Sequence, residues 1–204
     1  TTNYSYEIER IVSSKVRRDG SNCKNALKHT DAVTRADQKY QLHSYYSYSF
    51  EGHENKIWHI HGEMRKITSV VLGHYDYGRL LHRYIDEFDN KAKNKYKRDQ
   101  EKGRQTPISS MLDAFILGNV YILGLGLDFS EIDLWWLLNR KKREKAEHGR
   151  TIFYEPGNDN WTKKALLTTY DVEVRDLGFC PGLNNYSVFY DAAIEDIRKS
   201  ITKK

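Results

Sequence analysis

The feature that most constrains the fold is an alternation of short apolar strands and helices over residues 120–201 of the 204-residue chain. Strands are expected at 120–123, 151–154 and 171–174, and helices at 130–145, 160–169 and 185–201. The first of these helices is expected to be capped by Ser130 or Asp128. Short apolar strands that alternate with helices are typical of a parallel sheet covered by helices. The pattern predicts an α/β fold that binds its ligand beyond the carboxyl ends of the strands.

The first part of the chain is less regular, and its elements are expected from local patterns. Tyr46, Tyr48 and Phe50 alternate with small polar residues, which is the period of a half-buried strand. Similar reasoning favours strands at 56–61 and 68–73, and helices at 75–89 and 108–117. The segment 4–12 fits either a strand or a helix. The charged segment 90–105 either extends the helix before it or forms a loop.

A glycine-bearing turn follows the strand expected at 120–123. Gly124, Leu125 and Gly126 come directly after this strand, and Asp128 lies two residues further on. Glycines let the backbone approach a ligand closely, and the start of the next helix favours a phosphate group. The turn is therefore a candidate nucleotide site, although a tight turn without a ligand gives the same pattern.

A second candidate site lies around two histidines in the strand expected at 56–61. His59 and His61 would share a face of that strand, and Gly62 would let the chain turn directly after it. The imidazole of His61 would then lie at the carboxyl end of the strand, where it could accept a proton at neutral pH. The alternative is a metal site at His59 and His61, with further ligands from Glu63, His74 and Asp76.

The composition limits the class of protein. The net charge is +5. Most of the surplus lies in 91–104 and 140–145, where acidic residues interrupt the basic runs, so we expect solvated helix faces and no nucleic-acid partner. The two cysteines, Cys23 and Cys180, cannot form a four-cysteine zinc site, and they favour a reducing compartment such as the cytoplasm. No stretch reaches the roughly 20 apolar residues that a membrane helix requires, so no membrane partner is expected.

Several segments occur in the order found in one known family. They are Thr1-Thr2-Asn3-Tyr4, Ile57-Trp58-His59-Ile60-His61-Gly62, Val70-Val71-Leu72-Gly73 with Tyr77, and residues 122–134. The chain resembles the sirtuin-like domains of bacterial anti-phage defence and abortive-infection proteins. The resemblance extends from Thr1 to about Pro156 and implies one Rossmann-like, NAD-binding domain over residues 1–204.

The resemblance also implies a reaction and its residues. The family cleaves the nicotinamide–ribose bond of NAD. Asn3 matches the asparagine of the T-x-N motif, and His61 matches the catalytic histidine. Asn3 would orient the attacking water or a ribose hydroxyl, and His61 would take the proton. The residues expected to contact NAD are Thr2, Gly62, Gly124, Leu125, Gly126 and Asp128.

The chain departs from the family pattern at several positions. Ser5 stands where sirtuins usually carry an aspartate, and Gly126 stands where many carry a serine. The zinc-ribbon cysteines are missing, so we expect no zinc, and NAD hydrolysis or NAD binding rather than protein deacetylation. The glycine-rich phosphate loop and first strand of the family would lie upstream of Thr1. A non-catalytic nucleotide sensor is the alternative function, and a homo-oligomer is expected because such defence effectors often assemble.

Overall fold

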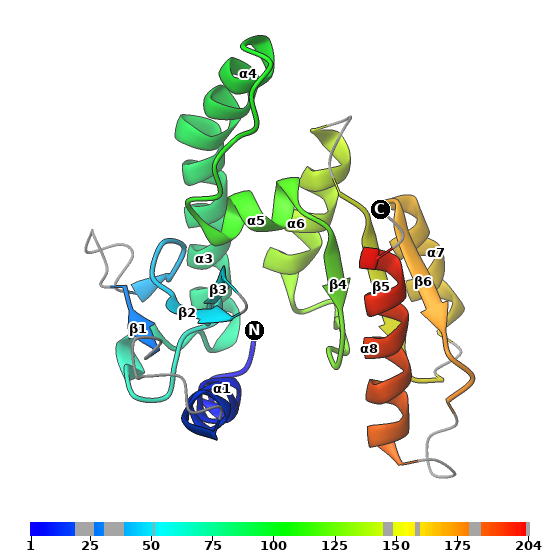
Figure 1. Ribbon diagram of the computed structural model, residues 1–204. Coiled ribbons are helices and arrows are strands. Elements are labelled where there is room, and N and C mark those ends of the chain that lie inside the picture. The colour runs from blue at the N-terminus through cyan, green and yellow to red at the C-terminus, as the bar shows by residue number, and fades with distance from the viewer. Residues whose placement is uncertain are drawn as a thin grey trace. The chain divides into compact units, whose positions relative to one another are not determined.

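The computed structural model describes residues 1–18, 27–30, 39–50, 52–144, 149–157, 160–179 and 185–202. These residues form two compact units, Thr1–Ala114 and Phe115–Lys204 (Figure 1). Cys23 and Cys180 lie outside the described residues. None of the described helices has the length and apolar character needed to cross a membrane.

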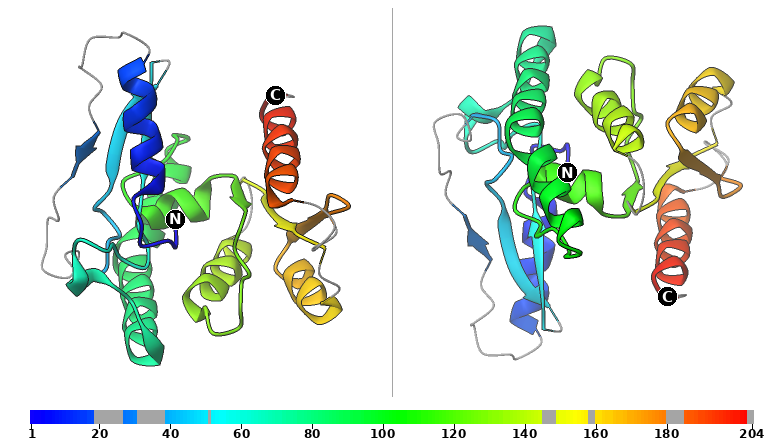
Figure 2. Two further views of the ribbon diagram at one scale, coloured as in Figure 1. Left: turned by 90° about the horizontal axis from the view of Figure 1, so that it is seen from below. Right: turned by 90° about the horizontal axis from the view of Figure 1, so that it is seen from above.

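The first unit contains a small antiparallel sheet with helix α1 (Glu7–Arg18) beside it (Figure 2). The strands are β1 (Lys28–His29), β2 (Tyr46–Phe50) and β3 (His53–Ile57), in the order β1-β2-β3. Tyr46 pairs with Ile57 and Phe50 with His53. The alternating pattern therefore predicted β2 correctly, whereas the ambiguous segment 4–12 is helical from Glu7 onward.

Two strands predicted for this unit are wrong. The strand expected at 56–61 is β3, which ends at Ile57 and belongs to the antiparallel sheet. His59 and His61 therefore do not lie on a strand, because the chain turns there and the N–H of Ile60 donates to the carbonyl of Thr1 over 3.0 Å. The strand expected at 68–73 is replaced by the 3₁₀ helix η1 (Ile67–Ser69) and an irregular segment.

A long helical run completes the first unit. It consists of α3 (Gly73–Glu87), the π-helical turn η2 (Phe88–Ala92) and α4 (Lys93–Glu101), so the charged segment extends the helix. Helix α5 (Met111–Leu117) begins later than predicted and spans the boundary between the units. The core of the first unit includes the fully buried side chains of Leu80, Tyr84, Phe88 and Leu112.

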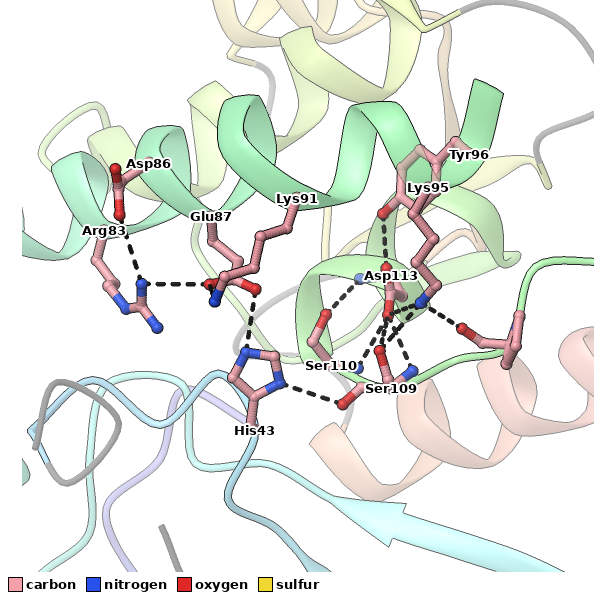
Figure 3. A network of polar contacts seen from close by, with 11 residues as sticks. His43, Arg83, Asp86, Glu87, Lys91, Lys95, Tyr96, Ser109, Ser110 and Asp113 are labelled. Carbon is pink, nitrogen blue, oxygen red and sulfur yellow. Dashed lines mark hydrogen bonds and ion pairs between the residues drawn. The ribbon is translucent and has the colours of Figure 1, made fainter. Parts of the chain in front are cut away.

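Two buried carboxylates tie the helical run to its neighbours (Figure 3). Glu87 of α3 accepts from His43 over 3.2 Å and from Lys91 over 2.9 Å. Asp113 of α5 accepts from the N–H and hydroxyl of Ser109, the N–H of Ser110, Lys95 and Tyr96. The hydroxyl of Ser110 accepts in return from the N–H of Asp113. This reciprocal pair is a capping box, which explains why α5 begins at Met111.

The second unit confirms the parallel sheet predicted from the sequence. Its strands are β4 (Val120–Ile122), β5 (Thr151–Glu155) and β6 (Val172–Asp176), which pair in parallel in the order β4-β5-β6. They alternate with α6 (Ile132–Arg143), α7 (Trp161–Thr169) and α8 (Tyr186–Thr202). This arrangement is compatible with a Rossmann-like fold.

Helices cover both faces of this sheet (Figure 2). Ile152 and Tyr154 of β5 pack against Phe189 and Ala193 of α8. Phe153 points to the opposite face, where the ammonium of Lys163 from α7 lies 5.2 Å from its ring centroid. The central strand β5 is buried at all five positions, as expected for a parallel strand between two helical layers.

Candidate functional site

The glycine-bearing turn lies at the carboxyl end of β4, as predicted. Gly124 has a φ of +69°, and a β-carbon there would lie 2.9 Å from the hydroxyl of Tyr190. Leu127 is also in the left-handed region, with a φ of 49°, and its side chain is 1% exposed. Gly124 and Gly126 are exposed and Leu125 is half-buried. The turn therefore presents its backbone to solvent at the edge where a parallel sheet binds ligands.

Asp128 shapes the connection from this turn to α6. Its carboxylate accepts from the N–H and the hydroxyl of Ser130, both over 2.9 Å, and these bonds lower the pKa of Asp128. Its own N–H donates to Glu131, and its carbonyl accepts from the indole of Trp135. The predicted cap by Ser130 or Asp128 is wrong, because Glu131 is the N-cap residue and no side chain caps the helix.

The most unusual group at this edge is Glu155, the last residue of β5, which the sequence reasoning missed. Its side chain is 1% exposed, and neither carboxylate oxygen has a hydrogen-bond partner among the described residues. The ammonium groups of Lys163 and Lys164 lie 3.4 Å from its two oxygens. Lys163 also donates to the carbonyl of Gly126 over 3.1 Å, so it joins the ends of β4 and β5. The two ammonium groups offset the negative charge of the buried Glu155, which ends its strand at the edge where parallel sheets bind ligands.

A sequence signal for Glu155 was available. The residue ends a strand that was predicted from its apolar character and directly precedes Pro156 and Gly157. The rule that placed Gly124 at the carboxyl edge of the sheet applies equally to an acidic residue at the end of the next strand.

In the first unit, the T-x-N and H-G motifs lie side by side. The N–H of Ile60 donates to the carbonyl of Thr1, and the N–H of Met64 donates to the carbonyl of Tyr4, both over 3.0 Å. The ring of His59 bonds to the carbonyl of Asn3 over 2.8 Å. The structure thus places the segments carrying Asn3 and His61 next to each other, although 58 positions separate these residues in the sequence.

The two predicted catalytic residues, Asn3 and His61, differ in how much of each is exposed to solvent. Asn3 is exposed, and its side-chain oxygen accepts from the N–H of Ser5 over 3.2 Å. Thr2 beside it is half-buried. The side chain of His61 is only 2% exposed, and its ring packs edge-on against Tyr77 with 5.2 Å between centroids. The expectation that His61 lies at the carboxyl end of a strand is therefore wrong, because β3 already ends at Ile57.

Gly62 allows the close approach of two backbone segments. It has a φ of +94°, and a β-carbon at this position would lie 2.1 Å from the carbonyl oxygen of Ser69. Its N–H donates to the carbonyl of His59 over 2.9 Å. This packing requires glycine irrespective of any ligand.

A buried polar cluster lies beside these motifs. Glu63 accepts from Tyr6, Tyr46 and Gln41 over 2.7, 2.8 and 2.6 Å. Burial raises the pKa of Glu63, but these hydrogen bonds outweigh burial and hold the pKa below its usual value. A pocket of about 370 Å³ next to the cluster is lined by Tyr6, Glu9, Arg10, Ser13, Ser14, Leu27, Tyr46 and Arg65. Neither Asn3 nor His61 is among these lining residues.

The metal alternative gains no support from the geometry. His59 uses one ring nitrogen toward Asn3 and the other toward Glu9, at 2.8 and 2.7 Å, so neither is open to a metal ion. Within the described part of the chain, no group of three or more histidine, cysteine or acidic residues could hold a metal ion.

Comparisons with known proteins do not identify the chain. No protein-family model matches it, and neither the curated proteins nor the solved structures include a match. The sirtuin-like resemblance therefore stays a prediction.

Proposed function

We propose that the chain binds NAD through the carboxyl edge of its parallel sheet and cleaves the nicotinamide–ribose bond. The observation that carries the binding is Glu155, a carboxylate 1% exposed without a hydrogen-bond partner among the described residues. In α/β folds that bind dinucleotides, an acidic residue of the sheet accepts hydrogen bonds from ribose hydroxyls. We assign this role to Glu155, and we assign backbone contacts with the nucleotide to Gly124 and Gly126.

The chemistry is assigned to Asn3 and His61. As the nicotinamide–ribose bond breaks, nicotinamide leaves with the bonding electron pair, and positive charge develops at the ribose carbon. A water molecule oriented by Asn3 would attack that carbon and pass its proton to His61. The adjacency of the T-x-N and H-G motifs supports this assignment. The resemblance to defence proteins suggests that the reaction depletes NAD during abortive infection.

A second candidate function is NAD binding without turnover. The burial of His61 favours it, since its imidazole is 2% exposed and is covered by Tyr77. In that case the chain would act as a nucleotide sensor of the same fold. The two functions share the nucleotide site at Glu155 and differ only in whether NAD is consumed.

The test measures NAD affinity by calorimetry and NAD consumption by nicotinamide release, in the protein including any residues upstream of Thr1. Glu155→Gln should weaken binding by about 10-fold or more, because hydrogen bonds to a charged group contribute about 1.5–3 kcal/mol. Glu173→Gln is the matched control, since Glu173 lies on β6 with its side chain 47% exposed. His61→Ala and Asn3→Ala should lower consumption by about 100-fold or more while affinity is retained.

The outcomes separate the candidates. Consumption that disappears in His61→Ala establishes the hydrolase, and binding without consumption establishes the sensor. If the wild-type protein does not bind NAD, both functions are wrong. If Glu155→Gln binds NAD as tightly as Glu173→Gln, the nucleotide does not use Glu155.

A further inference from the structure

His59 connects three segments of the first unit that are distant in the sequence. Its side chain is 1% exposed. One ring nitrogen, Nδ1, lies 2.8 Å from the carbonyl oxygen of Asn3, and the other, Nε2, lies 2.7 Å from Oε1 of Glu9 in α1. The ring also contacts the rings of Tyr6 and Tyr46, at 5.5 and 6.0 Å between centroids. A side chain held on all sides in this way has a defined orientation.

The partners of His59 determine where its protons lie. A carbonyl oxygen only accepts hydrogen bonds, so Nδ1 carries a proton and donates it to Asn3. The 2.7 Å contact between Nε2 and Glu9 also requires one proton, carried by either partner. The second oxygen of Glu9 is buried and has no hydrogen-bond partner among the described residues. The two contacts together fix both ring nitrogens, with Nδ1 directed at Asn3 and Nε2 at α1.

The hydrogen bond from His59 to Asn3 lies between two backbone hydrogen bonds that join the same segments. The segment that carries Asn3 is attached to the H-G segment through the carbonyls of Thr1 and Tyr4. Between them, the carbonyl of Asn3 is held by His59. The backbone of Asn3, and with it the start of its side chain, is therefore fixed by a proton-sharing pair whose other member lies on α1.

We propose that His59 is a positioning residue for NAD cleavage, which holds the backbone of Asn3 through its Nδ1 proton while the contact of Nε2 with Glu9 fixes the ring. This inference rests on the proposed function, because it assumes that Asn3 orients the attacking water. His59 touches neither NAD nor water in this role. It acts through Asn3 alone, so its loss should slow the reaction without weakening the binding of NAD at Glu155.

The test compares three variants by steady-state kinetics with NAD. His59→Phe retains an aromatic ring between Tyr6 and Tyr46 but loses both hydrogen bonds, and its kcat should fall by about 10- to 100-fold, as expected for a misplaced catalytic group. Glu9→Gln retains a donor for a neutral His59 ring, and its kcat should fall by less than about 3-fold. KM should stay within about 3-fold in all variants, because uniform binding is unaffected.

Tyr6→Phe is the matched control. It removes the hydrogen bond to Glu63 from the same buried cluster, but it leaves the bonds of His59 to Asn3 and Glu9 in place. A kcat within about 3-fold of the wild type is expected. An equal loss of kcat in Tyr6→Phe and His59→Phe would show a general effect of the cluster and would overturn the proposal.

Nuclear magnetic resonance of the uniformly ¹⁵N-labelled protein gives a second readout. The Nδ1 proton of His59 should exchange slowly, and the amide signals of Asn3 and Tyr4 should shift in His59→Phe but not in Tyr6→Phe. A His59 ring without a proton on Nδ1 would overturn the proposal. If His59→Phe does not fold, Glu9→Leu tests the proposal instead. Its kcat should fall by about 10-fold, whereas that of Glu9→Gln should not.

The outcomes are distinguishable from failure of the proposed function. If the wild-type protein does not cleave NAD, the proposed function fails and the positioning role fails with it. If the wild type cleaves NAD and His59→Phe has the same kcat, only the positioning role is wrong.

Discussion

At the scale of single residues, Gly62 is a position in the first unit where the packing leaves no room for a side chain. Its φ of +94° is unfavourable for any other residue, and an added β-carbon would lie 2.1 Å from the carbonyl oxygen of Ser69. We expect Gly62→Ala to lower the free energy of unfolding by about 2–5 kcal/mol, because it combines backbone strain with overpacking. Urea denaturation followed by circular dichroism measures this loss.

Gly78 provides the control for this prediction. It lies inside α3, and an added β-carbon there would meet no heavy atom within 4 Å. Gly78→Ala should therefore stabilise the protein by about 0.5–1 kcal/mol, the usual helical preference for alanine over glycine. Equal stability of the two variants would contradict the close approach of Gly62 to Ser69.

At the scale of elements, the second unit was far more predictable than the first. Strand β5 and helices α7 and α8 were located from residues within each element, since apolar runs and helical spacing are local signals. The strand expected at 56–61 failed because Ile60 bonds to Thr1, a contact that no local pattern reveals. The alternation in β2 was read correctly, but alternation alone does not tell whether the neighbouring strand is parallel or antiparallel.

In the candidate site too, features set by local sequence were predicted and features set by long-range contacts were not. The turn at Gly124 and Gly126 was placed correctly because it depends on the end of one predicted strand. The environment of His61 was not predicted, because its burial depends on Tyr77 and on the turn at Gly62. The pairing of His59 with Glu9 likewise joins residues 50 positions apart. Such long-range polar pairs leave no periodic signal in a single sequence.

The capping box of α5 gives a prediction at the element scale. Asp113 is 2% exposed and accepts hydrogen bonds from Lys95, Tyr96, Ser109 and Ser110 (Figure 3). Asp113→Ala should destabilise the protein by about 3–5 kcal/mol, because it leaves buried donors and a lysine without their partner. Thermal and urea unfolding measure the change.

Asp86 is the matched control for Asp113. Its side chain is 51% exposed beside Arg83, so Asp86→Ala should cost less than about 1 kcal/mol, as for other surface ion pairs. A loss for Asp113→Ala as small as that for Asp86→Ala would show that the network in Figure 3 does not stabilise the start of α5.

We expect the stability contributed by Glu87, which joins α3 to the segment before β2, to depend on pH. The hydrogen bond from His43, with help from Lys91, lowers the pKa of Glu87 from 4.5 to about 2. A carboxyl with a lowered pKa stabilises the folded state above its unfolded pKa, and this stabilisation is lost as the pH falls from 4.5 toward 2. We expect a contribution of about 1–3 kcal/mol at pH 6.

Urea unfolding between pH 2 and pH 6 tests this prediction. The wild type should be more stable than Glu87→Gln at pH 6, and the difference should shrink steadily as the pH falls below 4.5. A difference that stays constant over this range would show that Glu87 is not the titrating group.

At the scale of the whole molecule, each unit has a hydrophobic core of its own. Leu80 is fully buried in the first unit, and Leu137 is fully buried in the second. Removing either side chain to alanine should cost about 2–5 kcal/mol through the cavity it leaves. Because each side chain lies in the core of a different unit, we expect each substitution to lower the unfolding midpoint of its own unit more than that of the other.

The tryptophans allow both units to be followed in one experiment. Trp58 lies in the first unit, and Trp135, Trp136 and Trp161 lie in the second. In protein labelled with fluorotryptophan, ¹⁹F signals during urea unfolding should separate, with Leu80→Ala shifting the midpoint of Trp58 more than the other three and Leu137→Ala shifting the other three more than Trp58. If both substitutions shift all the signals together, the 204 residues unfold as one cooperative domain, as the sirtuin-like resemblance implies.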